Sequence, residues 1–384
     1  MPEAACYDDP IWPFTTTPSA ALVPDVAEPA QHGKRRRKMT VRTVVVCEAQ
    51  VPFVRGGAEV HVRQLVAQLR QRGYLAELVS VPFKWYPKEE ILPHTAAWRL
   101  LDLSEANGQP VDLLIASKFP TYFARHPNKV AWLIHQYRAA YELCGTEYSD
   151  FAHTELDVGL RDTLMQLDTD ALSECRRVFA NARNTAGRLA RYNGLTAEPL
   201  YHPPQLAPRL VPGPYGNYVL SVGRIESVKR VDLIIHAMAR VDAGIRLVVA
   251  GDGTQRVNAE RAAEDAGVSD RVTFLGTVGD DELIGLYAGA LAVVYPPFDE
   301  DFGYVTLEAF LARKPVVTCS DSGGPNEFVV DGVNGLVCPP HPEDLSAALS
   351  RLAADRAAAA AMGDAGYDVA RRITWDGVIE KLVA

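Results

Sequence analysis

Short apolar runs rich in β-branched residues alternate along this chain with longer segments whose apolar residues recur every three or four positions. The first pattern is typical of buried parallel strands and the second of amphipathic helices. In the first half of the chain, the apolar runs predict strands at 43–47, 75–81, 111–116, 129–134 and 177–180. Helical spacing predicts helices at 58–72, within the polar stretch 137–173, and at 185–192.

The same alternation starts again after a segment that is rich in proline. Residues 201–215 contain five prolines and therefore predict a linker without helix or central strand. Beyond it, strands are predicted at 217–222, 246–250, 272–275, 290–295 and 315–318. Helices are predicted at 231–241, 255–266, 281–288, 304–312, 343–354 and 358–371, followed by an amphipathic stretch at 374–384.

These elements predict an α/β fold with two Rossmann-like domains of similar size. We place the first domain at 39–207, the second at 208–372 and a separate C-terminal helix at 373–384. Ligands of such sheets bind at the carboxyl ends of the strands. The cleft between two facing domains is therefore the expected site.

The first 38 residues follow neither pattern. They hold six prolines and end in a basic run at 34–38, which is typical of a disordered leader. The basic run can contact anionic lipid headgroups, which would bring the protein to a membrane surface as a peripheral protein. The alternatives are a solvated tail, or a true start at Met39.

Composition narrows the class of protein. The 384 residues include 39 basic and 48 acidic side chains, and the net charge of −9 argues against a nucleic-acid binder. No apolar run reaches the roughly 18 residues of a membrane-spanning helix. The six cysteines form no Cys-x-x-Cys pair, and no secretory signal opens the chain. We therefore expect a cytoplasmic protein with reduced thiols.

The block 295–309 carries the most specific chemistry. It leaves a buried strand, turns through two prolines and enters a helix whose first turn Asp301 or Gly303 can cap. The free N–H groups and the positive dipole of such a turn suit a phosphate. Glu300 precedes the helix and Glu308 lies within it, so both carboxylates can approach one ligand and accept hydrogen bonds from sugar hydroxyls.

The Glu300-x7-Glu308 spacing, with its Phe-Gly insert, resembles the signature of the family 4 retaining glycosyltransferases of the GT-B fold, and the resemblance covers 41–384. It implies two Rossmann-like domains across a cleft and a final helix that crosses back to the first domain. It also implies a nucleotide-sugar donor, GDP- or UDP-linked, on the second domain, with no separate cofactor. Donor contacts are implied for Asp301, Phe302, Gly303, Tyr304, Val305 and Glu308.

Two other blocks agree with the resemblance. Arg224 and Lys229 correspond to the family's cations that hold the donor diphosphate, and two cations at a helix start would stabilise that leaving group. Arg230 stands where the family usually has glycine, a departure that should alter the local turn. Gly56 and Gly57 resemble the glycine loop that faces the diphosphate from the first domain.

Further segments fit the family pattern. Val278 is a candidate backbone contact to the nucleotide base, and the turn 251–253 resembles one that lines the donor cleft. Residues 322–327 resemble a Gly-Gly-x-x-Glu turn, for which a plain tight turn is the alternative. His135 ends a buried strand where the family often carries a histidine near the reacting sugar; a structural histidine is the alternative.

Two Asp-x-Asp pairs match the metal ligands of single-domain glycosyltransferases. Asp168 and Asp170 lie in a polar helical stretch and should be solvated. Asp299 and Asp301 flank Glu300 and belong to its longer motif. Because two cations already balance the diphosphate, we expect no catalytic metal.

We therefore predict a retaining, metal-independent hexosyltransferase with Glu300, His135, Arg224 and Lys229 as its catalytic residues. The acceptor would be a glycan, a lipid-linked or a small-molecule hydroxyl compound, bound mostly by the first domain. No carboxylate of that domain stands out as a nucleophile. The family resemblance therefore favours a front-face route in which the leaving diphosphate helps to deprotonate the acceptor.

The donor and the activity leave alternatives. The linker sequence Tyr201-His202-Pro203-Pro204 resembles a Tyr-Pro-Pro element of some mannosyltransferases, which favours GDP-mannose over a UDP-sugar, although His202 interrupts the element. A nucleotide-sugar 2-epimerase of the same fold is an alternative, but it needs more acid–base residues than the sequence offers. A non-catalytic sugar-nucleotide-binding subunit is a second alternative.

Overall fold

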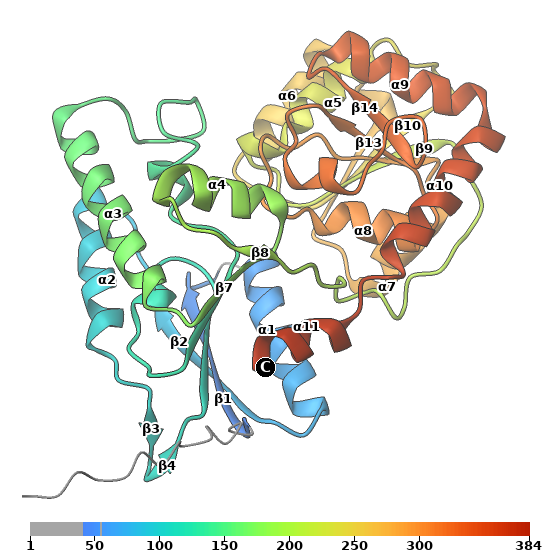
Figure 1. Cartoon of the computed structure of the whole chain (residues 1–384). Helices are drawn as coiled ribbons and strands as arrows, with labels where there is room; N and C mark the ends of the chain where they lie inside the picture. The colour runs from blue at the N-terminus through green and yellow to red at the C-terminus, as the bar shows by residue number, and fades with distance from the viewer. Residues whose placement is uncertain (1–40, 54–55) are drawn as a thin grey trace, which may run out of the picture. The chain divides into compact units, whose positions relative to one another are not determined.

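The computed structural model describes residues 41–53 and 56–384 (Figure 1). The expected leader, 1–38, lies outside the described residues, as do Val54 and Arg55 just before the first glycine pair. Contacts join Val41–Ala384 into one unit. In the part that is described, the chain forms two large parallel sheets, as the alternation of strands and helices predicts.

The first sheet has the strand order β2-β1-β5-β6-β7-β8, with parallel pairing throughout. Its strands are β1 (Thr43–Gln50), β2 (Leu75–Pro82), β5 (Leu113–Ala116), β6 (Lys129–Leu133), β7 (Arg177–Ala180) and β8 (Glu198–Pro199). The accompanying helices are α1 (Gly57–Gln71), α2 (Ile91–Leu100), α3 (Glu155–Ser173) and α4 (Arg183–Asn193). A small antiparallel ribbon is formed by β3 (Glu105–Ala106) and β4 (Gln109–Pro110).

The second sheet has the strand order β11-β10-β9-β12-β13-β14 and is also parallel. Its strands are β9 (Tyr218–Val222), β10 (Arg246–Ala250), β11 (Val272–Gly276), β12 (Ala292–Val294), β13 (Val316–Cys319) and β14 (Gly335–Cys338). Its helices are α5 (Val231–Met238), α6 (Arg256–Asp265), α7 (Asp280–Gly289), α8 (Tyr304–Leu311), α9 (Pro342–Ala354) and α10 (Arg356–Ala370). Short 3₁₀ turns lie at Lys88–Glu90, Thr121–Phe123, Arg138–Ala140, Ser227–Lys229, Ser269–Arg271 and Gly324–Glu327.

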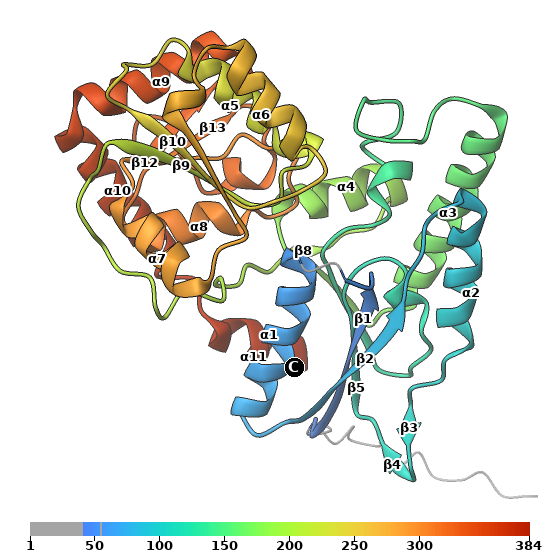
Figure 2. The ribbon, with the colours of Figure 1, turned by 180° about the vertical axis from the view of Figure 1, so that it is seen from behind.

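Each sheet is covered by helices on both faces (Figures 1 and 2). Successive residues of β1 point to opposite faces, so Val44 and Val46 pack with α1 while Val45 and Cys47 pack with α2 and α3. In the second domain α5, α6 and α9 share one core cluster, and α7, α8 and α10 share another. This layering leaves the loops at the carboxyl ends of the strands free to form a site.

The last helix, α11 (Trp375–Val383), packs on the first domain, although it follows the second in sequence. Val378, Ile379 and Leu382 share a buried cluster with residues of β1 and α1. Figure 2 shows α11 beside α1. The linker stretch 200–217 contains neither helix nor strand, which agrees with its proline content.

Five of the described helices and strands escape the sequence patterns: helix α2, strand β14 and the two-residue strands β3, β4 and β8. Helix α2 presents a narrow buried stripe of Ile91, Thr95 and Trp98, which does not stand out against its polar and proline neighbours. Strand β14 has four residues and lies at the sheet edge, where a long apolar run is unnecessary. Among the described residues, no helix has the length and apolar character to cross a membrane.

Candidate active site

The acidic loop, residues 295–303, connects β12 to α8 and lies at the carboxyl end of the second sheet. Gly303 occupies the N-cap of α8 with φ +81°, and a side chain there would meet Pro325 at 3.0 Å. Glycine is therefore required at this turn. Of the two residues expected to cap the helix, Gly303 does so, and Asp301 does not: its carboxylate pairs with Arg188 instead.

Glu300 forms an ion pair with Lys229, which follows β9 in the 3₁₀ turn Ser227–Lys229. The Lys229 ammonium also lies 3.2 Å from the Tyr295 hydroxyl. Burial alone would raise the pKa of Glu300, but the charge of Lys229 outweighs it and the pKa is lowered. The loop therefore presents a charged carboxylate held against a cation, with 16% and 18% of the two side chains still exposed.

The glycine pair of the first domain meets the second domain at this site. A β-carbon on Gly56 would lie 3.9 Å from the Arg224 guanidinium, and one on Gly57 would lie 3.3 Å from the Tyr304 ring. Arg224 itself is exposed. The structure thus brings together Gly56, Gly57, Arg224 and Tyr304, which are far apart in sequence.

A buried ion pair behind this glycine turn was not predicted. Lys118 Nζ lies 2.8 Å from Glu59 Oε1, and Glu59 Oε2 accepts a hydrogen bond from the Gly56 N–H at 2.9 Å. The pair fixes the start of α1, because Glu59 occupies the N3 position of a capping box. That spacing of three residues after Gly56 is the sequence signal that could have identified Glu59.

Arginines of the first domain pair with both aspartates of the acidic loop. Arg188, on α4, pairs with the carboxylates of Asp299 and Asp301, and Arg138 lies 3.5 Å from Asp301. Burial would raise the pKa of Asp301, but Arg138, Arg188 and His135 lower it to about 2. Sequence reasoning missed Arg138 and Arg188, since nothing near either residue in the chain indicates a partner more than 100 residues away.

His135 lies just after β6 and close enough to Asp301 to interact with its charge. Burial lowers the pKa of His135, so the ring is neutral at physiological pH. Its Nδ1 lies 2.6 Å from the Gln136 carbonyl oxygen and must donate the proton to it. Nε2 therefore carries the lone pair and can accept a hydrogen bond from a hydroxyl.

Other predicted donor contacts lie in or beside the core of the second domain. Phe302 is buried and stacks on His202 with ring centroids 4.7 Å apart, and Val305 is buried in the same cluster. Val278 is half-buried against it. Since the side chains of Phe302 and Val305 are occupied by packing, only their backbone groups can serve a ligand.

Glu308 lies on α8, where one carboxylate oxygen accepts a hydrogen bond from the Tyr287 hydroxyl at 2.7 Å. Burial raises the pKa of Glu308. Its environment therefore differs from that of Glu300, which forms an ion pair with Lys229.

Arg230, which the family resemblance places where glycine is usual, adopts a backbone conformation that is rare for a residue with a side chain. Arg230 has φ +51°, the left-handed conformation that a glycine would adopt there. Its guanidinium holds the turn by donating to the carbonyls of Pro296 and Pro297 and forming a bidentate pair with Asp321 at 2.6 and 2.8 Å. These contacts offset the backbone cost and tie the start of α5 to the acidic loop.

The expectation that Asp168 is solvated was wrong. Asp168 is fully buried on α3 and accepts a hydrogen bond from the Tyr141 hydroxyl at 2.6 Å. Burial without a cationic partner raises its pKa to about 7. Asp170, two residues on, is exposed, as expected of the helix surface. No group of three or more metal-ligating side chains gathers within residues 41–53 and 56–384.

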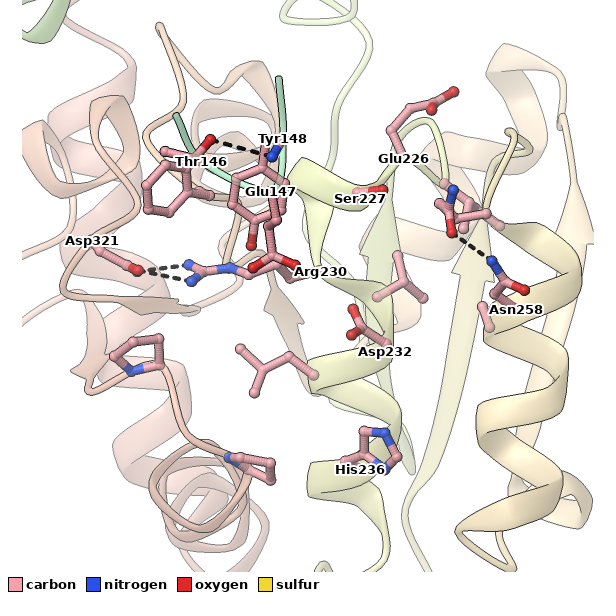
Figure 3. Close-up of a pocket in the computed structure, with 18 residues that line it drawn as sticks. Thr146, Glu147, Tyr148, Glu226, Ser227, Arg230, Asp232, His236, Asn258 and Asp321 are labelled. Atoms are coloured by element: carbon pink, nitrogen blue, oxygen red, sulfur yellow. Dashed lines mark hydrogen bonds and ion pairs between the residues drawn. The ribbon is translucent and has the colours of Figure 1, made fainter. Parts of the chain in front are cut away.

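A cavity of about 800 Å³ lies beside the acidic loop (Figure 3). Its walls include Tyr148 from the first domain, Phe298 from the loop, and Asp232 and His236 from α5. The Arg230–Asp321 pair lines one side. None of Arg224, Lys229 or Glu300 is among the described residues that line it, although their chain neighbours Ile225 and Arg230 are.

Comparisons with known proteins agree with this geometry. The profile of the family described as glycosyl transferases group 1 matches residues 211–369. A D-inositol 3-phosphate glycosyltransferase from Actinosynnema mirum is 30% identical over 360 residues, which cover 83% of this chain and 83% of that protein. An alpha-1,3/1,6-mannosyltransferase from Homo sapiens is 31% identical over 179 residues, 42% of this chain and 43% of that protein.

Several other sequence matches are shorter, and the structural matches concern the fold alone. The chain aligns with only 39% to 50% of the length of the first curated relatives that it matches. The structure of HepE from Anabaena, in complex with UDP and glucose, superposes with a TM-score of 0.66 at 18% identity and covers 89% of this chain and 98% of that one. At this identity the likeness establishes a shared fold.

Proposed function

The chain belongs to the group 1 glycosyl transferases with the GT-B fold, and from that premise we propose that it transfers a hexose from a nucleotide sugar to an acceptor hydroxyl with retention of configuration. The observation that carries the proposal is the Lys229–Glu300 ion pair, partly exposed at the carboxyl end of the second sheet. Arg224 and the start of α8 lie in the same loop region. Together they offer cations for a diphosphate and a carboxylate for a sugar.

Charge stabilisation is the main chemical contribution of these residues. When the sugar leaves, negative charge grows on the diphosphate, and Arg224, Lys229 and the free N–H groups of α8 would stabilise it. These groups are already in place before the reaction, so they need little reorganisation. Loss of one such preorganised group costs about 3–4 kcal/mol in comparable enzymes.

Glu300 and His135 would orient the hexose. When diphosphate competes for Lys229, the Glu300 carboxylate is released to accept hydrogen bonds from sugar hydroxyls. The Nε2 lone pair of His135, in the first domain, would accept a hydrogen bond from a further hydroxyl of the hexose. Such positioning of reacting groups is itself a large source of rate acceleration.

Retention by a double displacement would need a free carboxylate in the first domain. Glu59 is the candidate nearest the glycine turn, but both of its oxygens are engaged, by Lys118 and by the Gly56 N–H. We therefore favour the front-face route, in which the departing diphosphate accepts the proton of the attacking hydroxyl. The acceptor is a glycan, a lipid-linked or a small hydroxyl compound, as expected from the family resemblance.

GDP-mannose is the first donor to test, and the similarity to a mannosyltransferase supports the choice of mannose as the sugar. The linker residues that pointed to mannose now have packing partners: the Tyr201 hydroxyl bonds to Glu327 at 2.7 Å, and His202 bonds to His61 at 2.8 Å and to Tyr304. These contacts give both residues a packing role in the linker. Peripheral membrane contact through the basic run 34–38 remains a separate proposal.

A thermal-shift screen of UDP, GDP and ADP tests the donor site, because a ligand of the folded state raises its stability. Incubation with the matching nucleotide sugar then tests the reaction by release of free nucleotide. Hydrolysis or transfer supports an enzyme, and binding without turnover supports a non-catalytic subunit. An isomerised nucleotide sugar identifies a 2-epimerase, and no stabilisation by any nucleotide would refute the proposal.

A further inference from the structure

The backbone on both sides of Glu300 is held by helix α4 of the other domain. Asn184 Nδ2 donates to the Asp299 carboxylate at 2.7 Å and to the Glu300 carbonyl at 2.9 Å. Arg188 donates to the Asp299 carbonyl and pairs with Asp301. Arg138 donates to the same Asp299 carbonyl at 2.6 Å. The Glu300 side chain itself points to its partner Lys229 in the second domain.

The loop conformation needs such support. Asp299 has φ +42°, in the left-handed region that residues with a side chain rarely adopt. Conformations of this kind persist only where the surroundings hold them. Within its own domain the segment is held by hydrogen bonds from Asp299 N and Glu300 N to the carbonyls of Asp321 and Ser322, both at 2.9 Å. The Gly324 N–H also donates to the Glu300 carbonyl at 2.8 Å. Further anchors come from α4 and Arg138.

Helix α4 is in turn fixed to the second domain at its N-terminus. The Glu327 carboxylate accepts the backbone N–H groups of Arg183 at 2.9 Å and Asn184 at 2.7 Å. The Tyr201 hydroxyl donates to the same carboxylate. Glu327 thus acts as a cap supplied from another domain, which sets where Asn184 and Arg188 stand.

We propose that Asn184 and Arg188 are positioning residues that place the Glu300 carboxylate on Lys229 by holding the backbone of Asp299–Asp301. The inference rests on the proposed function, since it assigns these residues to the geometry of that site. It follows that a residue of the donor-binding domain is correctly placed only while α4 of the first domain stays docked. Turnover would then depend on the first domain even where donor affinity does not.

The decisive variant is Asn184→Asp, which keeps the shape of the side chain. It replaces an N–H donor with an oxygen that faces the Asp299 carboxylate and the Glu300 carbonyl. We expect kcat for transfer to fall at least about tenfold, with the donor KM within about twofold of wild type. Hydrogen exchange of the 296–303 segment should become faster, a readout that requires no turnover.

Three further variants sharpen the test. Adding Asp299→Asn to Asn184→Asp exchanges donor and acceptor between the two side chains and should recover part of kcat. Arg191→Ala is the matched control, because Arg191 is exposed on the same helix and should leave kcat and exchange unchanged. Arg188→Lys keeps the charge but loses the fork that reaches two aspartates, so it should lower kcat by an intermediate amount.

Unchanged kcat and unchanged exchange in Asn184→Asp would overturn the inference. Equal losses of kcat, donor affinity and melting temperature, without recovery in the double variant, would also overturn it, because they indicate a purely structural role. If the wild-type chain releases no nucleotide from any nucleotide sugar, the proposed function fails. In that case, the rate of hydrogen exchange of the 296–303 segment in Asn184→Asp still tests whether Asn184 holds the loop.

Discussion

The two Asp-x-Asp segments of this chain each contain a buried aspartate, and the two aspartates have opposite electrostatic environments. Asp301, before α8, and Asp168, on α3, are both buried. Asp301 meets Arg138, Arg188 and His135, which lower its pKa to about 2. Among the described residues, Asp168 accepts a hydrogen bond from the Tyr141 hydroxyl and has no cationic partner, and burial raises its pKa to about 7. The charge state of a buried carboxylate is therefore decided by the partners that folding brings to it, and not by its motif.

The comparison also separates function from stability. The segment 299–301 lies at the domain contact beside Lys229, where charge is needed for the proposed chemistry. The segment 168–170 lies on a helix whose apolar residues pack in the first-domain core. Changes in the first segment should therefore affect turnover, and changes in the second should affect only stability.

The largest effect is expected from Glu300→Gln, which removes the charge and keeps the shape. Transfer should fall about 10²–10³-fold, because the carboxylate no longer orients the sugar or pairs with Lys229. Steady-state kinetics with the nucleotide sugar measures the loss, and circular dichroism checks the fold. Asp170→Asn, on the exposed face of α3, is the control and should turn over like wild type. Comparable activity of the two variants would contradict the assignment of the site.

The next effect is expected from Asp301→Asn. Breaking a buried ion pair costs about 3–5 kcal/mol, because Arg188 and Arg138 lose part of their compensation. Since the folded-state pKa of Asp301 is depressed, the stability from its charge is present above about pH 4 and is lost as pH falls through about 2. Urea midpoints of variant and wild type should therefore differ most at pH 7 and converge toward pH 3. A pH-independent difference would show that the charge is not the cause.

Asp168→Asn should change stability in the opposite direction, because it should make the protein more stable. Between about pH 4 and 7 the folded protein holds a proton on Asp168 that the unfolded chain releases, so wild-type stability falls as pH rises through this window. Asparagine cannot ionise, so the variant should gain up to about 4 kcal/mol at pH 8, at roughly 1.4 kcal/mol per pKa unit. Thermal unfolding at pH 8 and pH 4 measures this gain, which should vanish at pH 4. Turnover should not change.

The smallest effect is expected from a chelator. The carboxylates of Asp299 and Asp301 are engaged by Arg188 and cannot both turn to a metal without breaking ion pairs. Excess EDTA should therefore leave transfer within about twofold of its untreated rate, since cations of the chain balance the diphosphate. Loss of activity that manganese or magnesium restores would contradict this expectation and point to Asp299 and Asp301 as ligands.

Local pattern was enough to predict most of the fold, and the family resemblance supplied the candidate site residues that lie along single loops. Apolar runs and helical spacing predicted most strands and helices, because burial against a sheet demands those periods whatever the partner. Arg224 and Lys229 became candidates through that resemblance, and Glu300 and Gly303 through their place before a predicted helix start together with the resemblance. All four lie in loops that follow a buried strand.

Only the tertiary structure decided which charges meet. Arg188 and Asp301 are 113 residues apart, and no property of either neighbourhood encodes the other. The same holds for the His61–His202 pair, which joins α1 to the linker. The left-handed turn at Arg230 depends on distant carbonyls and on Asp321. The sequence shows where apolar residues recur, and this spacing is enough to predict strands and helices. The pKa, the ion-pair partner and the backbone strain of a polar residue depend on groups that only the folded chain brings together.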